Sequence, residues 1–288
     1  MSQLDKKSWG ITEAPLVSVI IPAYNRAWAL ENAIDSVLMQ DYSNFEVIVV
    51  DDGSTDDTSA LLSSYKHDII RIHQANKGVS AARNQGVAKA AGRLIAFLDS
   101  DDYWQPQKLS AQAAFFNAHP DARICQTEEI WIRNDRRVNP GRRHQKPEGQ
   151  IFIPSLELCL VSPSAVMLKK DLFTELGGFD ENLPACEDYD LWLRVSCQYP
   201  VHLIKKPLVI KRGGHPDQLS RQPGLDKYRI ASIEKLLAGQ KLSTRQYSAA
   251  VKVLKTKCAI YAAGCRKRGK GREADYYSGL AQTYAGAG

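Results

Sequence analysis

Long hydrophobic runs and low-complexity tracts are missing from this 288-residue sequence. No run approaches the roughly 20 apolar residues that a membrane-spanning helix needs. The first ten residues are polar and charged, without the apolar stretch of a secretory signal. We therefore expect a cytoplasmic protein in which 1–15 form an N-terminal tail.

Cysteine pairs of the C-x-x-C type are also absent, although the chain contains six cysteines. Their scattered positions argue against a zinc site or a dense disulfide framework, so we interpret them as reduced and mostly buried. The composition, 44% hydrophobic and 24% charged, is typical of a globular protein and excludes extensive disorder.

Short apolar runs alternate with helical patterns in the first hundred residues. The predicted strands are Val17–Ile21, Val47–Val50, Ile69–Ile72 and Leu94–Leu98. The predicted helices between them are 28–38, Asp56–Ser64 and Val79–Ala90. This order predicts an α/β fold with a parallel sheet covered on both faces. Ligands bind such sheets at the carboxyl ends of the strands, where polar clusters stand here at Pro22–Arg26, Asp51–Thr55 and Asp99–Asp102.

The second half of the chain alternates less regularly. A helix is expected up to about His119, then a strand near Ile124–Ile132 and a basic, turn-rich segment, Asn134–Gly149, that we expect to be a mobile loop. Further expected elements are a strand at Ala165–Leu168, helices at Lys170–Leu176 and Glu187–Gln198, and a strand at Leu208–Ile210.

The sequence after Leu225 is helical in pattern. Apolar residues recur there every three or four positions: Tyr247, Val251, Leu254, Cys258, Tyr261 and Cys265. We expect this stripe to pack onto the main domain, with the seam of a homodimer as the alternative.

Asp99-Ser100-Asp101 places two carboxylates at the end of an apolar strand. Carboxylate oxygens bind divalent cations, and such a cation can neutralise the charge of a departing diphosphate. At the turn that leaves a strand, both aspartates can reach one ion, or one can bind the ribose of a nucleotide. Acidic triplets also occur in solvated turns, so the triplet alone is a weak signal.

Five motifs in order make the chain resemble the family 2 glycosyltransferases from about Val17 to Leu219. They are Val19–Asn25, Val49–Asp56, Asn76–Asn84, Phe97–Asp102, and Gly177–Asp180 followed by Glu187-Asp188. The resemblance implies the GT-A fold, a Rossmann-like, mostly parallel mixed sheet flanked by helices. The implied domain is 16–222, divided into a nucleotide-binding part (16–105) and an acceptor-binding part (106–222). Residues 223–288 form a C-terminal helical extension.

The resemblance also implies a donor site. Its residues are Pro22, Ala23, Tyr24, Asn25, Arg26, Asp52, Lys77, Gly78, Arg83, Asp99 and Ser100. Tyr24 is expected to lie against the nucleotide base and Asp52 to accept a hydrogen bond from its edge. The alternatives are a plain strand-to-helix turn at Pro22–Asn25 and a surface arginine at position 83.

The resemblance further implies a site for Mn²⁺ or Mg²⁺ at Asp101, with Asp99 and His215 as additional ligands. Asp188 matches the base that takes the proton of the acceptor hydroxyl, with inversion at the sugar carbon. Glu187 and Trp104 are expected on the acceptor side. Acidic residues also favour a helix N-terminus without any chemistry, and a loop histidine is often merely exposed.

These residues predict transfer of a single sugar from a nucleotide-diphosphate sugar, with UDP favoured, to an acceptor hydroxyl in cell-surface polysaccharide or lipopolysaccharide synthesis. The membrane helices and Q-x-x-R-W motif of processive synthases are missing. One alternative is a catalytically degenerate protein of the same fold that binds nucleotides or glycans. Another is a sugar nucleotidyltransferase, which normally has a glycine-rich loop where Pro22–Asn25 has no glycine.

Two basic segments bear on the partners. Asn134–Gly149 is rich in basic residues and is expected to contact a glycan or a lipid-linked, anionic acceptor. Arg266–Arg272 favours peripheral contact with an anionic membrane at its inner face. Both segments could instead be simply solvated. No nucleic-acid partner is expected.

Overall fold

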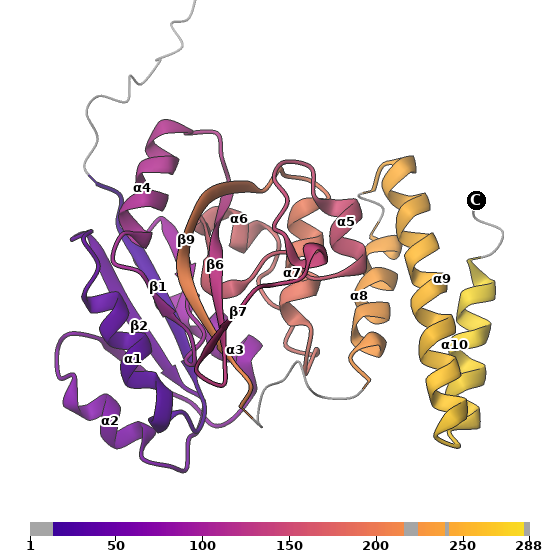
Figure 1. Cartoon of the computed structure of the whole chain (residues 1–288), viewed down its shortest axis with the longest axis horizontal. Helices are drawn as coiled ribbons and strands as arrows, with labels where there is room; N and C mark the ends of the chain where they lie inside the picture. The colour runs from indigo at the N-terminus through magenta and orange to yellow at the C-terminus, as the bar shows by residue number, and fades with distance from the viewer. Residues whose placement is uncertain (1–13, 216–223, 240–241, 285–288) are drawn as a thin grey trace, which may run out of the picture.

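The computed structural model describes residues 14–215, 224–239 and 242–284. They form one mixed sheet with helices on both faces, followed by a group of C-terminal helices (Figure 1). The strand order is β3-β2-β1-β4-β8-β6-β9-β5, and β7 pairs with β6. The α/β fold predicted from the sequence is therefore confirmed.

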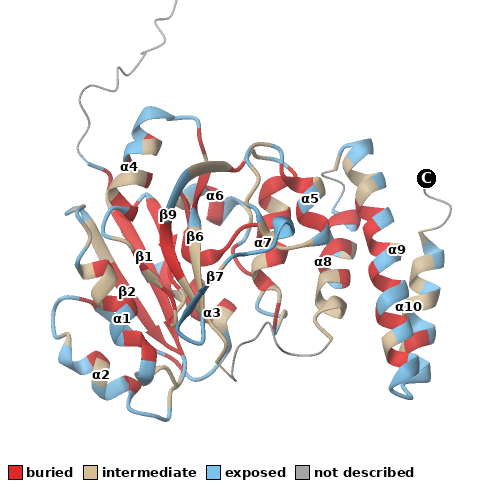
Figure 2. Cartoon of the chain, viewed as in Figure 1, coloured by how far each residue is buried: buried red, intermediate tan, exposed pale blue. Residues whose placement is uncertain are grey.

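The first half of the sheet is parallel, and its strands are mostly buried except for the exposed edge strand β3. Its strands are β1 (Val17–Ala23), β2 (Phe45–Asp51), β3 (Ile70–His73) and β4 (Leu94–Phe97). All seven residues of β1 are buried, as expected of a strand covered on both faces (Figure 2). The helices that connect these strands are α1 (Ala27–Leu38), α2 (Thr58–Ser64) and α3 (Val79–Lys89).

The helices α1 and α3 pack on opposite faces of β1. Ile21 belongs to the same core cluster as Leu30 of α1, whereas Ile20 belongs to the cluster that contains Ala82 of α3. Gly86 allows α3 to approach closely, because a Cβ atom there would lie 2.4 Å from Cγ2 of Ile20. Because a hydrophobic core covers each face of the sheet, successive residues of the central strands are mostly apolar.

The second half of the sheet is mixed. Its strands are β5 (Tyr103–Trp104), β6 (Ile124–Arg133), β7 (Arg136–Val138), β8 (Val166–Lys169) and β9 (His202–Gly213). Its helices are α4 (Lys108–Ala118), α5 (Phe152–Glu157), α6 (Lys170–Glu175) and α7 (Glu187–Ser196). The 3-10 turns are η1 (Arg142–His144) and η2 (Pro163–Ala165). The chain reverses between β4 and β8, which pair antiparallel.

The segment Asn134–Gly149, expected to be a loop, has structure of its own. β7 turns back antiparallel on β6, with Trp131 opposite Val138. The turn η1 follows, and Gly149 forms an isolated bridge with Val201. These backbone hydrogen bonds attach the segment to the edge of the sheet.

The C-terminal helices are α8 (Asp226–Ala238), α9 (Thr244–Lys267) and α10 (Gly271–Thr283). Helix α9 begins with a capping box between Ser243 and Gln246. Its apolar residues Val251, Leu254, Cys258, Tyr261 and Cys265 share one core with Phe152 of α5 and Tyr189 of α7. The stripe therefore packs within the chain, as predicted. The domain boundary between 222 and 223 lies outside the described residues and stays a prediction.

Candidate functional site

Two loops meet beyond the carboxyl ends of β1 and β2. The backbone N–H of Asn25 donates to Ser54 Oγ (2.9 Å), and Asn25 Oδ1 accepts from the N–H of Thr55 (2.8 Å). Asn25 adopts a φ of 52°, a left-handed conformation that asparagine tolerates better than most residues. Tyr24 is 45% exposed, so its ring is accessible to a ligand. The loop predicted to hold the nucleotide is therefore built from both strand ends.

Asp52 lies beneath this loop and is buried. Its carboxylate accepts from the backbone N–H groups of Lys77 and Gly78 (both 2.8 Å) and from Nε2 of Gln74 (2.6 Å). These bonds attach the start of α3 to the end of β2. The carboxylate brings Lys77 and Gly78 to the site, and its expected contact with a base edge stays a prediction.

The residues of the acidic triplet after β4, Asp99-Ser100-Asp101, make different contacts. Asp101 Oδ2 lies 2.7 Å from Nε2 of His215, a residue 114 positions later in the chain. Burial and the neighbouring Asp99 raise the pKa of Asp101. Ser100 is buried. The ring of His215 packs edge-on against Trp28, at a centroid distance of 5.4 Å. The fold thus brings Asp101 and His215 together.

This pair suits a divalent cation. An oxygen and an imidazole nitrogen are suitable ligands for Mn²⁺, and a cation would stabilise the charged form of Asp101, whose pKa is raised first by burial and then by Asp99. Within the described residues, no group of three or more His, Cys, Asp or Glu side chains could hold a metal ion. A bound metal would therefore need further oxygen ligands from a diphosphate or from water.

Arg83 connects the two acidic parts of the site. Its Nη2 donates to Asp99 and its Nη1 donates to Glu187, both at 2.6 Å. The side chain is 4% exposed and lies over the ring of Phe179 at 5.0 Å. Arg83 was expected to contact the donor, but both of these nitrogens are engaged by carboxylates. It holds the end of β4 against the start of α7.

The Glu187-Asp188 pair begins helix α7. The residue before it, Cys186, has a φ of 62°, which is a strained backbone conformation for a residue other than glycine. Glu187 is 5% exposed and its carboxylate pairs with Arg83, while its expected place on the acceptor side stays a prediction. Asp188 is half-buried, and its Oδ2 lies 3.5 Å from the thiol of Cys159. Of the two carboxylates, Asp188 is the one with access to solvent.

Trp104, expected on the acceptor side, lies buried in the core. It is 3% exposed, and its indole Nε1 donates to the carbonyl of Ser164 (2.8 Å). Nζ of Lys108 lies 3.8 Å from its ring centroid. These contacts show that the Trp104 side chain packs within the core.

Ser164 and Lys211 belong to none of the sequence motifs, and the structure adds them to the site. Ser164 Oγ accepts from the N–H of Asp99 (3.1 Å) and donates to Asp102 (2.7 Å). Burial alone would lower the pKa of Lys211, but nearby carboxylates, including those of Asp102 and Asp188, raise it. Lys211 therefore supplies positive charge between the strand end and α7.

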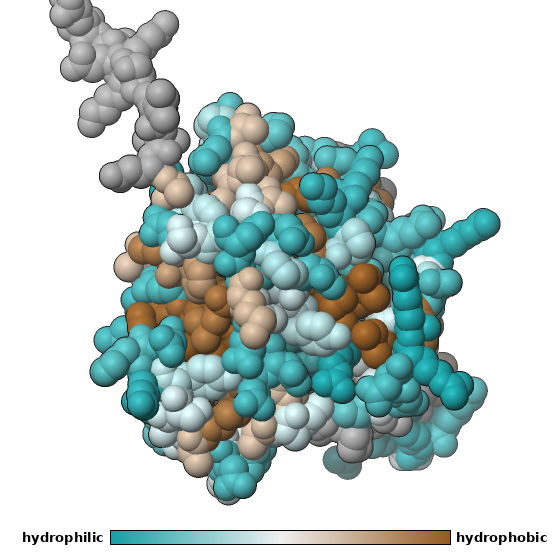
Figure 3. All heavy atoms as spheres, turned by 60° about the vertical axis from the view of Figure 1, so that its left-hand side comes forward, coloured by the Kyte–Doolittle hydropathy of each residue, from teal (hydrophilic) through white to brown (hydrophobic). Residues whose placement is uncertain are grey.

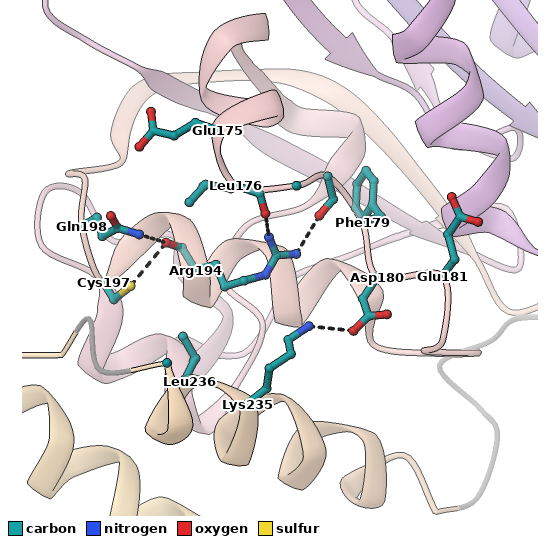
Figure 4. Close-up of a pocket in the computed structure, with 13 residues that line it drawn as sticks. Glu175, Leu176, Phe179, Asp180, Glu181, Arg194, Cys197, Gln198, Lys235 and Leu236 are labelled. Atoms are coloured by element: carbon teal, nitrogen blue, oxygen red, sulfur yellow. Dashed lines mark hydrogen bonds and ion pairs between the residues drawn. The ribbon is translucent and has the colours of Figure 1, made fainter.

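The Gly177–Asp180 motif lines a different cavity, of about 500 Å³, next to α7 and α8 (Figure 4). Arg194 points across it and donates to the carbonyls of Leu176 (2.5 Å) and Gly178 (2.7 Å). Lys235 of α8 pairs with Asp180 at 2.7 Å. These groups bind one another, so the motif holds α7 in place rather than contributing to the acidic site.

The polarity of the surface and of the helices is relevant to whether the chain could enter a membrane. Hydrophilic residues predominate on the face drawn in Figure 3, and the hydrophobic ones gather in separate patches. None of the helices in the described ranges is both long and apolar enough to cross a bilayer.

Solved structures with the same architecture define the class. The chain matches S. aureus TarS 1–349 in complex with UDP-GlcNAc with a TM-score of 0.67 and 18% identity, over 94% of this chain and 92% of that one. The UDP complex of the same protein gives a TM-score of 0.62. The fold is that of the GT-A glycosyltransferases.

The family follows from the sequence comparisons. The model described as glycosyl transferase family 2 matches residues 18–177, and a second one, glycosyltransferase like family 2, matches 148–228. The first match covers more than half of the chain. The chain therefore belongs to glycosyltransferase family 2.

Curated relatives agree with this placement. An uncharacterized glycosyltransferase of Rickettsia typhi is 36% identical over 201 residues, which make up 67% of this chain and 63% of the relative. WfaP of Escherichia coli, a UDP-Glc:alpha-D-GlcNAc-diphosphoundecaprenol beta-1,3-glucosyltransferase, is 36% identical over 182 residues (62% of this chain, 70% of WfaP). Of a second relative, from Rickettsia felis, the chain spans only 32%.

Proposed function

We propose that this protein is an inverting glycosyltransferase that moves one sugar from a UDP-sugar to a hydroxyl of a lipid-linked glycan in cell-surface glycan synthesis. The observation that carries the proposal is the bridge made by Arg83, which joins the acidic end of β4 to the start of α7. This bridge holds Asp101 and Asp188 on either side of one buried ion-pair network. Two carboxylates with separate tasks are what metal-assisted transfer with a base requires.

The donor would bind across the loops after β1 and β2, with its base against Tyr24. Asp101 and His215 would hold Mn²⁺ or Mg²⁺, which supplies positive charge to the departing diphosphate. Family membership and the UDP donor in the name of WfaP support this choice of nucleotide.

On the opposite side, Asp188 would accept the proton of the acceptor hydroxyl. The oxygen then forms a bond to the anomeric carbon, while the bond from that carbon to the diphosphate breaks. Attack opposite the leaving group inverts the configuration. Cys159 and the α7 N-terminus would orient and stabilise the Asp188 carboxylate.

The test is nucleotide binding followed by turnover. Calorimetry with UDP, GDP and their sugars, with and without Mn²⁺, should give metal-dependent binding of UDP species. Asp188→Asn should abolish transfer while UDP still binds, and Asp101→Asn should weaken the metal dependence of binding. Asp171→Asn, whose side chain is 70% exposed, is the matched control and should change neither. Full turnover by Asp188→Asn would remove its assigned role.

The alternative, a catalytically degenerate binding protein, predicts nucleotide binding without transfer or hydrolysis under any metal. The acidic residues at positions 101 and 188 weigh against it.

A lipid-linked acceptor would also bring the enzyme to the membrane, where the exposed basic turn between α9 and α10 could bind anionic lipid. Pelleting with anionic vesicles, lost on charge reversal of Arg266 and Arg272, tests that contact.

A further inference from the structure

An aromatic pair stands at the outer end of β6, on the same edge of the sheet as the strand ends proposed for the donor but three strands away from β1. The ring of Trp131 lies edge-on to the ring of His144, with centroids 5.2 Å apart and planes at 60°. Both side chains are half-buried, so part of each is accessible. The indole Nε1 of Trp131 donates to Glu129 Oε2 at 2.9 Å, which fixes the orientation of the ring.

The hairpin with β7 produces this arrangement. Because Trp131 pairs with Val138, the chain turns back along β6 before it reaches η1. Figure 1 shows β7 beside β6. The turn η1 then brings His144 against Trp131, and Nε of Arg143 lies 3.2 Å from Nε2 of His144. Arg142 and Arg143 are both exposed, so positive charge begins directly beside the aromatic pair.

Contacts from Trp131 through Glu129 to Lys146, followed by charge interactions through Lys211, link the pair to Asp188. Glu129 accepts from Trp131 and pairs with Lys146 at 3.0 Å. Burial alone would raise the pKa of Glu129, but Lys146 and Lys211 lower it to about 2, so the carboxylate stays charged. Lys211 is the register partner of Trp131 in the pairing of β6 with β9, and its own charge is stabilised by Glu129 and Asp188. The aromatic pair therefore belongs to the same polar network as the proposed base.

The chemistry of this surface fits a sugar that carries a phosphate. The C–H face of a pyranose packs on an indole ring, which offers a large, rigid apolar surface. A guanidinium binds phosphate oxygens through paired N–H donors. A nucleotide base could also stack on tryptophan, but the proposed base contact, Tyr24, lies on the loop after β1 at the donor side.

We propose that Trp131 and His144 bind the sugar ring of the acceptor and that Arg143 binds the phosphate attached to that sugar. This assignment rests on the proposed function, since it names the acceptor class for the same active site. It places the acceptor between the hairpin and Asp188.

The experiment uses N-acetylglucosamine 1-diphosphate with a short alkyl chain as the acceptor probe. Its binding to the full chain is followed by ligand-observed NMR and by calorimetry, with UDP binding measured in parallel. Trp131→Ala should weaken probe binding by about tenfold or more, because the apolar contact is lost. Trp131→Phe, which loses the same hydrogen bond to Glu129 but keeps a ring, should stay within about threefold.

Arg143→Gln should weaken binding of this probe but not of the same sugar without its diphosphate. Arg245→Gln, at an exposed arginine in the first turn of α9, is the control and should change neither. In turnover, the Trp131→Ala variant should raise the KM for the probe, with kcat and the KM for the nucleotide sugar nearly unchanged.

The outcomes separate the two proposals. No binding of the probe to the wild type, or equal binding by Trp131→Ala and the wild type, overturns the acceptor site. Loss of UDP binding in Trp131→Ala overturns it as well, because the ring would then serve the donor. If the wild type binds the probe through Trp131 but transfers no sugar from any nucleotide sugar, the acceptor site stands and the proposed function fails.

Discussion

Replacing Lys108 with methionine should stabilise the protein at neutral pH. The lysine is fully buried beside Trp104, and its Nζ donates to Gln112 Oε1 at 2.6 Å. Burial lowers its pKa from 10.5 to about 7. Keeping this amine in the core at pH 7 therefore costs about 4 kcal/mol relative to the unfolded chain.

Methionine removes that cost but leaves Gln112 Oε1 without its donor, which offsets about 2 kcal/mol. The net expectation is a free energy of unfolding about 2 kcal/mol higher for Lys108→Met at pH 7. Equilibrium unfolding in urea measures it. Lys89→Met, at an exposed position of α3, is the control and should change little.

The sign of the pH dependence gives a second check. The folded pKa lies below the unfolded one, so between about pH 7 and 10.5 the unfolded chain holds the proton that the folded chain has lost. Wild-type stability should therefore rise with pH across that range, by about 3 kcal/mol between pH 7 and 9.5 from this group. The advantage of Lys108→Met should vanish over the same interval. A constant difference between the two proteins would refute the reasoning.

Three further changes follow from the contacts described above. Arg83→Gln should destabilise the fold by about 3 kcal/mol, measured in urea, because it leaves two carboxylates facing one another without their cation; Arg83→Lys should retain more stability yet still lose most transfer in a turnover assay. Gly86→Ala should cost about 1–3 kcal/mol through its clash with Ile20, and Ile20→Ala, which removes the clashing Cγ2, should cost less in the Gly86→Ala chain than in the wild type in the same unfolding experiment. Ser243→Ala should cost about 1 kcal/mol by removing the N-cap of α9, seen as a lower urea midpoint.

The parallel half of the sheet could be predicted because its physical signal is local. Val17–Ile21 and Leu94–Leu98 are apolar and β-branched runs that suit strands buried on both faces, and each runs into a polar turn. Parallel strands of a βαβ unit place their carboxyl ends at one edge. Asn25 and Thr55, which lie in two of the predicted polar clusters, are accordingly hydrogen-bonded to each other.

The second half of the sheet was harder to predict because its pairings are not local. β5 has two residues, and β9 runs through Pro207 at an irregularity of its pairing with β6. Neither has the alternation of an independent strand. The basic segment before Gly149 looked like a loop, yet hydrogen bonds to β6 make β7 from Arg136–Val138.

The role of an individual site residue depends on which polar groups the fold places beside its side chain. Asp52 and Arg83 lie in motifs that predict donor contact, but the fold surrounds them with partners of opposite charge or with N–H groups. Sequence spacing gives the position of a side chain along an element and not the groups that face it from elsewhere. The closeness of Asp101 and His215 came from a family resemblance, since no local pattern links positions so far apart.

The bridge made by Arg83 has a consequence for how the site works as a unit. Asp99 follows β4, which is fixed in the parallel sheet, whereas Glu187 starts a helix that packs against α8 and the C-terminal core. A guanidinium buried between them holds both carboxylates at once, a geometry that lysine cannot reproduce. Arg83, packed over Phe179, thereby couples the strand end that carries the proposed metal position to the helix that carries the proposed base. The C-terminal helices, through α7, support the position of that base even though they lie away from the strand ends.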